Sequence, residues 1–284
     1  MTKFINEDLK KLAQIPHFQR AVTFFGSARL GRESPYYEQA KALARECVRA
    51  GFSVITGGGG GIMQAANEGA FEAGRELEKF NNGGENLSNL SKNCENSLNL
   101  GENSRENGEN SQISSQTSLN SNKNSHKNSA NAAQNLPNSS SGVNLSANKN
   151  GANSPKAQPN AQKAHSVGFN IFLPFEQKSN DFLDYNITFK SLAVRKMALI
   201  QASLAFVIFP GGFGTLDEFL EVLTLKQLGF KNVPIFALGS EFWRGLDEFI
   251  RASLLANAVI SRGDEGLYEI TDDLSLVLSR LKVL

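Results

Sequence analysis

Residues 209–218 combine a predicted anion site with a carboxylate. They read Phe-Pro-Gly-Gly-Phe-Gly-Thr-Leu-Asp-Glu and follow a short apolar run. Glycines let backbone N–H groups approach an anion closely, and a helix that begins there adds partial positive charge. The hydroxyl of Thr215 is a further donor, and Glu218 supplies the carboxylate. The predicted anion cradle comprises Gly211, Gly212, Gly214 and Thr215.

A carboxylate beside a bound phosphate suits the cleavage of a glycosidic bond. A sugar that is held by its phosphate would present its anomeric carbon near Glu218. Cleavage there passes through an oxocarbenium-like transition state, which a carboxylate stabilises while it positions or deprotonates water. The simpler interpretation is that Glu218 and Asp217 only complement the dipole of the helix in its first turn.

Two other segments carry charged residues that we expect near this cradle. Arg195 and Lys196 lie among apolar residues just before the strand that feeds it. A guanidinium binds phosphate through two hydrogen bonds, although a dibasic pair on a helix is more often a solvated face. Glu176 follows a predicted strand and therefore faces the same pocket, or it is an ordinary loop carboxylate.

Alternating strands and helices must position these residues. The predicted strands span 20–27, 52–56, 167–173, 204–209 and 233–238, and the predicted helices span 35–49, 62–73, 189–201, 215–228, 241–257 and 272–281. Such alternation predicts an α/β fold, in which helices cover both faces of a parallel sheet.

Three of the predicted strands end in glycine-rich turns, at 26–27, 57–61 and 211–214. Parallel strands bind ligands at their carboxyl ends, so we expect the three turns at one edge, with Ser27 and Gly58 joining the phosphate site. None of the turns has the spacing of a P-loop or of a dinucleotide-binding fingerprint. Tight turns without a ligand are the simpler alternative.

Composition divides the 284 residues into one interrupted domain. Residues 81–165 contain no Phe, Tyr or Trp, and Asn and Ser make up nearly half of them. Such a segment buries too little apolar surface to offset its ordering entropy. We therefore expect residues 1–80 and 166–284 to form a single domain, interrupted by a disordered insert over 81–165.

The remaining composition excludes several classes of protein. A net charge of +1 gives no reason to expect binding to nucleic acid. Cys47 and Cys94 are isolated, and His17, His126 and His165 are dispersed, so we expect no metal site and no Ser/His/Asp arrangement. No leader or membrane span is recognisable, which favours a cytoplasmic protein.

The motifs together resemble a known family. Residues 210–218 with Arg195-Lys196 resemble the paired signature, PGGxGTxxE and RK, of the LOG ("Lonely Guy") proteins. Residues 25–29, 57–63 and 168–177 also resemble the larger bacterial branch of that family. These proteins are cytokinin riboside 5′-monophosphate phosphoribohydrolases, formerly labelled lysine decarboxylases. The resemblance covers the chain except its N-terminal tail and the insert.

The resemblance implies a Rossmann-like domain that forms a homodimer or a larger homo-oligomer. It implies hydrolysis of a nucleoside 5′-monophosphate, AMP or an N6-substituted AMP, to free base and ribose 5-phosphate, with no cofactor. Arg195 and Glu218 match the catalytic pair of the family. Lys196 and residues 211–215 match its phosphate-binding residues, and Glu176 falls where the family has a substrate-contacting carboxylate.

Two rival functions use the same residues differently. A nucleotide- or cofactor-binding carrier without chemistry would explain the glycines, but it leaves Arg195 and Glu218 without a role. A decarboxylase would need a lysine that forms a Schiff base with pyridoxal phosphate, and Lys196 is the candidate.

Overall fold

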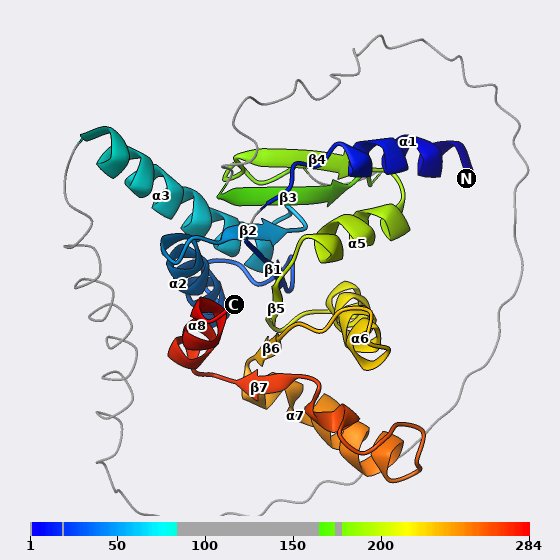
Figure 1. The fold of residues 1–284 in the computed structure, drawn as a ribbon. Coiled ribbons are helices and arrows are strands. Elements are labelled where there is room, and N and C mark those ends of the chain that lie inside the picture. The colour runs from blue at the N-terminus through cyan, green and yellow to red at the C-terminus, as the bar shows by residue number, and fades with distance from the viewer. Residues whose placement is uncertain (1, 19, 84–164, 174–177) are drawn as a thin grey trace, which may run out of the picture.

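The computed structural model describes residues 2–18, 20–83, 165–173 and 178–284 (Figure 1). Most of the predicted insert therefore lies outside the described residues, and so does Glu176. The strands are β1 (Ala21–Phe25), β2 (Ser53–Thr56), β3 (Ser166–Ile171), β4 (Tyr185–Phe189), β5 (Ala205–Ile208), β6 (Ile235–Leu238) and β7 (Glu269–Thr271). The α-helices are α1 (Thr2–Ala13), α2 (Pro35–Arg49), α3 (Ile62–Gly83), α5 (Leu192–Gln201), α6 (Phe213–Gln227), α7 (Ser240–Phe249) and α8 (Leu274–Lys282).

All seven strands pair in parallel, in the order β4-β3-β2-β1-β5-β6-β7. The chain builds the sheet outward from β1 through β2, β3 and β4, and then returns to the other side of β1 with β5. This reversal is a topological switch point, where parallel sheets open a crevice at the carboxyl ends of their strands. The predicted α/β, Rossmann-like fold is confirmed.

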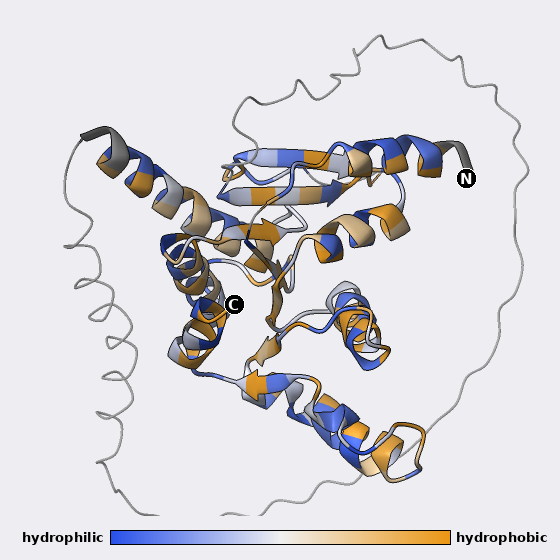
Figure 2. Ribbon diagram, in the orientation of Figure 1, coloured by the Kyte–Doolittle hydropathy of each residue, from blue (hydrophilic) through white to orange (hydrophobic). Residues whose placement is uncertain are grey.

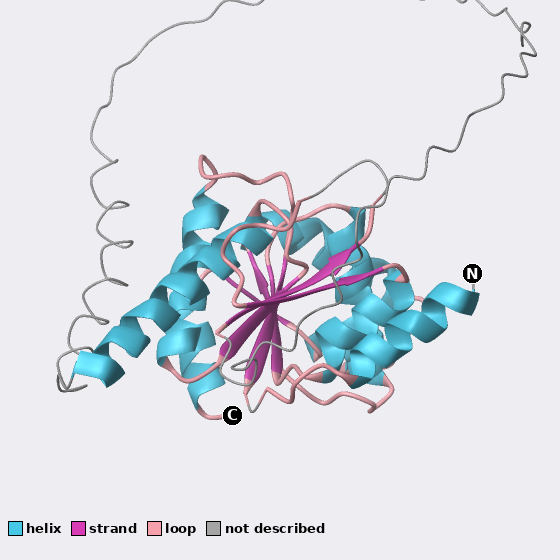
Figure 3. Ribbon diagram, turned by 90° about the horizontal axis from the view of Figure 1, so that it is seen from above, coloured by secondary structure: helices cyan, strands magenta, loops and turns pink. Residues whose placement is uncertain are grey.

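Helices cover both faces of the sheet, which lies between two helical layers in Figure 3. Alternate residues of β1 point to opposite sides, so that Val22 and Phe24 pack under α2, α3 and α8. Ala21 and Phe25 belong to the second core, under α1, α5, α6 and α7. Apolar residues dominate the central strands β1, β5 and β6, whereas β3, β4 and β7 and the helices mix apolar with hydrophilic residues (Figure 2).

The sequence patterns missed three elements. The strand β4 alternates buried and exposed residues at its end, but no strand is predicted there, and its last residue, Phe189, falls in the helix predicted over 189–201. The strand β7 has only three residues and carries no periodic signal. The helix α1 falls in what the sequence presents as a tail, although Ile5 and Leu12 pack against the second core.

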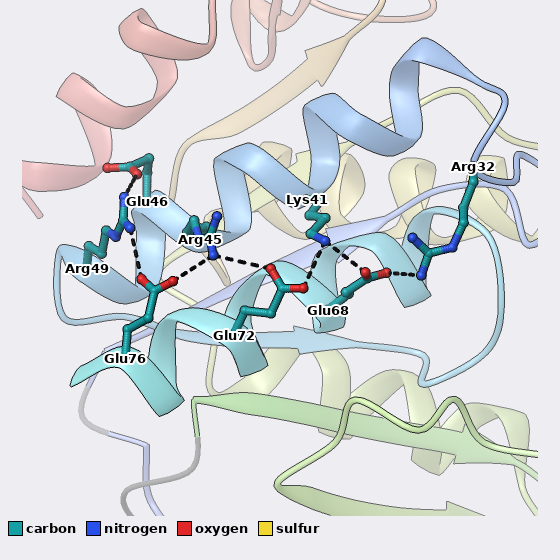
Figure 4. A network of polar contacts seen from close by, with 8 residues as sticks. All are labelled: Arg32, Lys41, Arg45, Glu46, Arg49, Glu68, Glu72 and Glu76. Carbon is teal, nitrogen blue, oxygen red and sulfur yellow. Dashed lines mark hydrogen bonds and ion pairs between the residues drawn. The ribbon is translucent and has the colours of Figure 1, made fainter. Parts of the chain in front are cut away.

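Two helices extend differently from their predicted bounds. The segment predicted as one helix over 241–257 divides into α7 and a π-helical continuation, η4 (Ile250–Leu255), and a short 3₁₀ turn, η5 (Asp264–Gly266), follows. The helix α3 continues to Gly83, ten residues past its predicted end. A ladder of ion pairs with α2 runs along α3 and reaches into this extension at Glu76 (Figure 4).

The α2–α3 ladder alternates cations of α2 with carboxylates of α3. Its contacts are Lys41 with Glu68 and Glu72, Arg45 with Glu72 and Glu76, and Arg49 with Glu76. Glu68 is buried and also accepts hydrogen bonds from Arg32 and Tyr37, each at 2.7 Å. Burial alone would raise the pKa of Glu68, but the hydrogen bonds from Lys41, Tyr37 and Arg32 outweigh it and lower the pKa. Glu68 therefore stays ionised and holds α3 against α2.

Candidate active site

The three glycine-rich turns lie at one edge of the sheet, because β2, β1 and β5 are neighbours and parallel. Ser27 joins them. Its N–H donates to the carbonyl of Pro210 at 3.0 Å, and its own carbonyl accepts from the N–H of Ile62 at 2.9 Å. The turn after β1 is thus tied both to the turn after β5 and to the first residue of α3.

The predicted anion cradle is the beginning of α6, with Gly212 as N-cap. The first N–H groups of a helix have no partner within it, so they point outward with the positive end of the dipole. A Cβ added at Gly212 or Gly214 would meet nothing within 4 Å, which leaves this helix end open. Thr215 is buried beneath it, and a Cβ on Gly211 would lie 2.1 Å from its Oγ1.

Arg195 and Glu218 meet across this edge. Arg195, from the first turn of α5, donates from Nε to the carbonyl of Phe169 at 2.7 Å and from Nη1 to Glu218 Oε1 at 3.2 Å. The guanidinium is buried, and a Cβ on Gly57 would lie 2.2 Å from Nη2. Arg195 thus connects β3 with α6 and lies against the turn that follows β2.

Glu218 lies in the second turn of α6, not in the first, because the helix already begins at Phe213. Helical side chains lean toward the N-terminus, which directs this carboxylate back toward the cradle. Its side chain is 14% exposed. Burial raises the pKa of Glu218 to about 7, and the charge and hydrogen bond of Arg195 oppose that rise. A carboxyl group with this pKa exchanges protons readily at neutral pH.

Lys196 points to α6 instead of the cradle. Its Nζ lies 3.1 Å from Asp217 Oδ2 and 2.9 Å from Glu221 Oε2. Burial alone would lower the pKa of Lys196, but its hydrogen bonds to Glu221 and Asp217 outweigh burial and raise the pKa. In this structure Lys196 therefore joins α5 to α6, next to the Arg195–Glu218 pair.

Gly58 is placed at the same edge with positive φ of 70°, where a side chain would be strained. Its N–H already donates to Thr56 Oγ1 at 2.8 Å, so this group is not available to an anion. A Cβ on Gly58 would lie 2.3 Å from Asn170 Nδ2. Gly58 accordingly allows the backbone to pass close to Asn170.

A buried amide network supports these turns, and the sequence patterns did not indicate it. Asn67 accepts from Thr56 Oγ1 at 2.6 Å and donates to Ser166 Oγ at 2.9 Å. Asn180 donates from Nδ2 to the carbonyl of Gly59 and to Asn67 Oδ1, both at 2.9 Å. Neither Asn67 nor Asn180 stands out by spacing or composition in the sequence. These amides fix the turn after β2 against the loop that precedes β4.

Other features bear on the class of site. Two cavities, of about 340 and 400 Å³, lie away from these residues, one between the end of α1 and α5 and the other beside β6 and β7. Within the described residues, no group of three or more His, Cys, Asp or Glu side chains is arranged to bind a metal ion. In the same part of the chain, no helix has the length and apolar character needed to span a membrane.

The second half of the chain resembles a known family. A family model described as "Possible lysine decarboxylase" matches residues 151–281. A cytokinin riboside 5′-monophosphate phosphoribohydrolase of Arabidopsis thaliana is 44% identical over 57 residues, which are 20% of this chain and 27% of that protein. Its counterpart from Rhodococcoides fascians is 42% identical over 57 residues, 20% and 29% of the two chains.

The matched region thus spans little more than a quarter of the length of these curated relatives. Over that region the resemblance to the LOG family is confirmed. A solved molybdenum cofactor binding protein from Rippkaea orientalis is 13% identical, with a TM-score of 0.46 over 94% of this chain and 98% of that one.

Proposed function

We propose that this protein hydrolyses the N-glycosidic bond of a nucleoside 5′-monophosphate, AMP or an N6-substituted AMP. The bond between C1′ of the ribose and the base nitrogen breaks, and the oxygen of water bonds to C1′. One proton of that water goes to the leaving base, so that the products are free base and ribose 5-phosphate. The names of the relatives from Arabidopsis thaliana and Rhodococcoides fascians support this reaction class.

The observation that carries the proposal is the Arg195–Glu218 pair beside the open end of α6. Glu218 lies five residues after the first residue of α6, which is about 8 Å along the axis at 1.5 Å per residue. The phosphate binds the N–H groups at the end of the helix, and the ribose extends from it toward the carboxylate. A purely structural ion pair would not need to lie at a ligand-binding edge.

Each group then has a role in the reaction. Ionised Glu218 stabilises the positive charge that develops on the ribose and accepts a proton from water. Arg195 orients that carboxylate and contributes charge at the ribose-phosphate end. The phosphate-binding roles of Ser27, Gly58, Lys196 and Glu176 stay predictions. Lys196 would have to leave Asp217 and Glu221 to reach the phosphate.

The decarboxylase function in the description of the family model is poorly supported by Lys196. Schiff-base formation needs a neutral amine, and the two carboxylates around Lys196 favour its charged form. An absorbance spectrum of the protein with added pyridoxal phosphate tests this function directly. A Schiff-base band that disappears in Lys196→Met would favour the decarboxylase.

The test of the proposed function is release of adenine and ribose 5-phosphate from AMP, followed by chromatography. We expect turnover of AMP, and none of adenosine, because the 5′-phosphate anchors the substrate. Glu218→Gln and Arg195→Ala should each lower kcat/KM by about 10³-fold. Full turnover by both variants would refute the mechanism. Tight retention of nucleotides without any turnover would instead favour the carrier.

We also propose that the chain assembles as a homodimer or a larger homo-oligomer. Large apolar side chains of α5 and α6 are exposed near the candidate site, and Phe213 reaches 92% exposure. The others on these two helices are Leu192, Met197 and Leu220. Exposed apolar residues of this size favour an interface. Light scattering coupled to size exclusion measures the mass, and a monomer at micromolar concentration would contradict the proposal.

A further inference from the structure

The N-terminal helix α1 holds the turn that precedes α5. Asp8 of α1 is fully buried, with 0% exposure. Its Oδ2 accepts from the N–H groups of Lys190 at 2.7 Å and Ser191 at 2.6 Å, and its Oδ1 accepts from Lys11 Nζ at 3.1 Å. A carboxylate persists at such a depth only where hydrogen bonds and an opposite charge replace water. The contact is therefore specific.

Other side chains of α1 contact the same turn. Lys11 Nζ donates to the carbonyl of Thr188 at 2.7 Å. The ammonium of Lys190 lies 4.9 Å from the ring centre of Phe4 and 3.7 Å from Glu7 Oε2. We call Asp8 and Lys11, together with the backbone of residues 188–191 that they bind, the α1 clamp. It joins a helix outside the motifs of the family resemblance to the last residues before α5.

The α1 clamp ends one turn before Arg195. Ser191 is the N-cap of α5, and its carbonyl accepts from the N–H of Arg195 at 3.0 Å. The side chain of Arg195 then reaches Phe169 and Glu218 through single hydrogen bonds. A shift of the first turn of α5 is consequently transmitted along a long side chain to the guanidinium.

We propose that Asp8 is a positioning residue for the Arg195–Glu218 pair, which makes α1 part of the framework of the active site. Its importance for catalysis rests on the proposed function, but its effect on Glu218 does not. Asp8 touches neither member of the pair and acts through Lys190, Ser191 and the first turn of α5. The competing explanation is that α1 only covers apolar surface.

The two explanations differ in the titration of Glu218. The charged groups that act on Glu218 are Arg195 and Lys196 of α5 and Asp217 of α6, and Arg195 is the strongest of them. If the α1 clamp is loosened, Arg195 moves away from Glu218, and the pKa of Glu218 rises. Loss of a merely covering helix would lower stability without this rise.

The experiment compares Asp8→Asn with Glu7→Gln in the full chain labelled with ¹³C at the glutamate carboxyl carbons. The signal of Glu218 is the one that is lost in Glu218→Gln. In Asp8→Asn we expect its pKa to rise by about half a unit or more, and kcat/KM for AMP to fall about tenfold. Glu7→Gln removes only an exposed pair from the same helix and should change neither quantity.

An unchanged or lowered pKa of Glu218 in folded Asp8→Asn would overturn the proposal. If Asp8→Asn does not fold, Lys11→Met decides in its place, because it removes the bonds to Asp8 and Thr188 and keeps the carboxylate. Lys11→Met should also raise the pKa of Glu218, and an unchanged pKa in this variant would overturn the proposal. If the unmodified protein does not hydrolyse AMP, the proposed function fails while the titration still tests the role of Asp8.

Discussion

Gly57→Ala should displace the guanidinium of Arg195 without disturbing the fold. The added Cβ would lie 2.2 Å from Arg195 Nη2 and 2.7 Å from Met63 Sδ, and ordinary contact begins at 3.4 Å. Both neighbours are the ends of long side chains, so they can move. The backbone of Gly57 has no positive φ, so alanine is not strained there.

The magnitude follows from the required movement. The guanidinium has to retreat by about 1 Å, and a misplacement of that size at a reacting group lowers the rate about 10²-fold. We therefore expect kcat/KM for AMP to fall by about 10²-fold, which corresponds to about 2.7 kcal/mol. The hydrogen bond between Arg195 Nη1 and Glu218 Oε1, at 3.2 Å, is the first contact to be lost.

The assay is release of ribose 5-phosphate from AMP, with Gly245→Ala as the matched control. Gly245 lies in α7, and a Cβ there would meet nothing within 4 Å, so this variant should keep full activity. Near-ultraviolet circular dichroism verifies that both variants are folded. Full kcat/KM in folded Gly57→Ala would refute the idea that the position of Arg195 limits the reaction.

Three further predictions concern charge. The pKa of Glu218 of about 7 predicts that kcat/KM rises with pH and levels off above pH 8, about tenfold above its value at pH 6, whereas a flat profile would exclude an essential carboxylate. Because folding raises the pKa of Glu218 above that of an exposed glutamate, its protonated form stabilises the fold at low pH, and this stabilisation is lost as the pH rises through about 7. In urea unfolding, the free energy of unfolding of the unmodified protein should fall by about 3 kcal/mol between pH 4.5 and 8, relative to that of Glu218→Gln. A difference between the two proteins that stays constant over this range would contradict the raised pKa. Glu68→Gln should lower the free energy of unfolding by about 2 kcal/mol. The control Glu78→Gln, in an exposed pair with Arg75, should lower it by less than about 0.5 kcal/mol. Equal losses of unfolding free energy in the two variants would contradict the role given to Glu68.

Local patterns in the sequence were enough to predict five of the strands and the edge where the glycine-rich turns meet. The helix over 35–49 was predicted at its observed bounds, because Ser34 and Pro35 mark its start and its apolar residues keep a helical period. The glycines after β1, β2 and β5 were expected to meet because parallel strands share an edge, and the sheet order brings them together. Both inferences depend on short-range rules.

Contacts between distant segments could not be predicted in this way. The role of Asp8 depends on Lys190 and Ser191, more than 180 positions along the chain. Likewise, Lys196 is one residue from Arg195 in sequence but pairs with α6, because successive helical residues point in different directions. Only the packing of α5 against α6 decides which cation faces Glu218.

The place where the chain leaves the domain has a consequence for the evolution of its length. A Cβ on Gly74 would lie 2.6 Å from Cδ2 of His165, so the chain that leaves α3 at Gly83 re-enters beside the middle of that helix, about 14 Å back along the axis. The closure entropy of a flexible connection between Gly83 and His165 grows only with the logarithm of its length. A connection ten times shorter would recover only about 2 kcal/mol. Insertions and deletions at this junction should therefore have only a small effect on the stability of the domain.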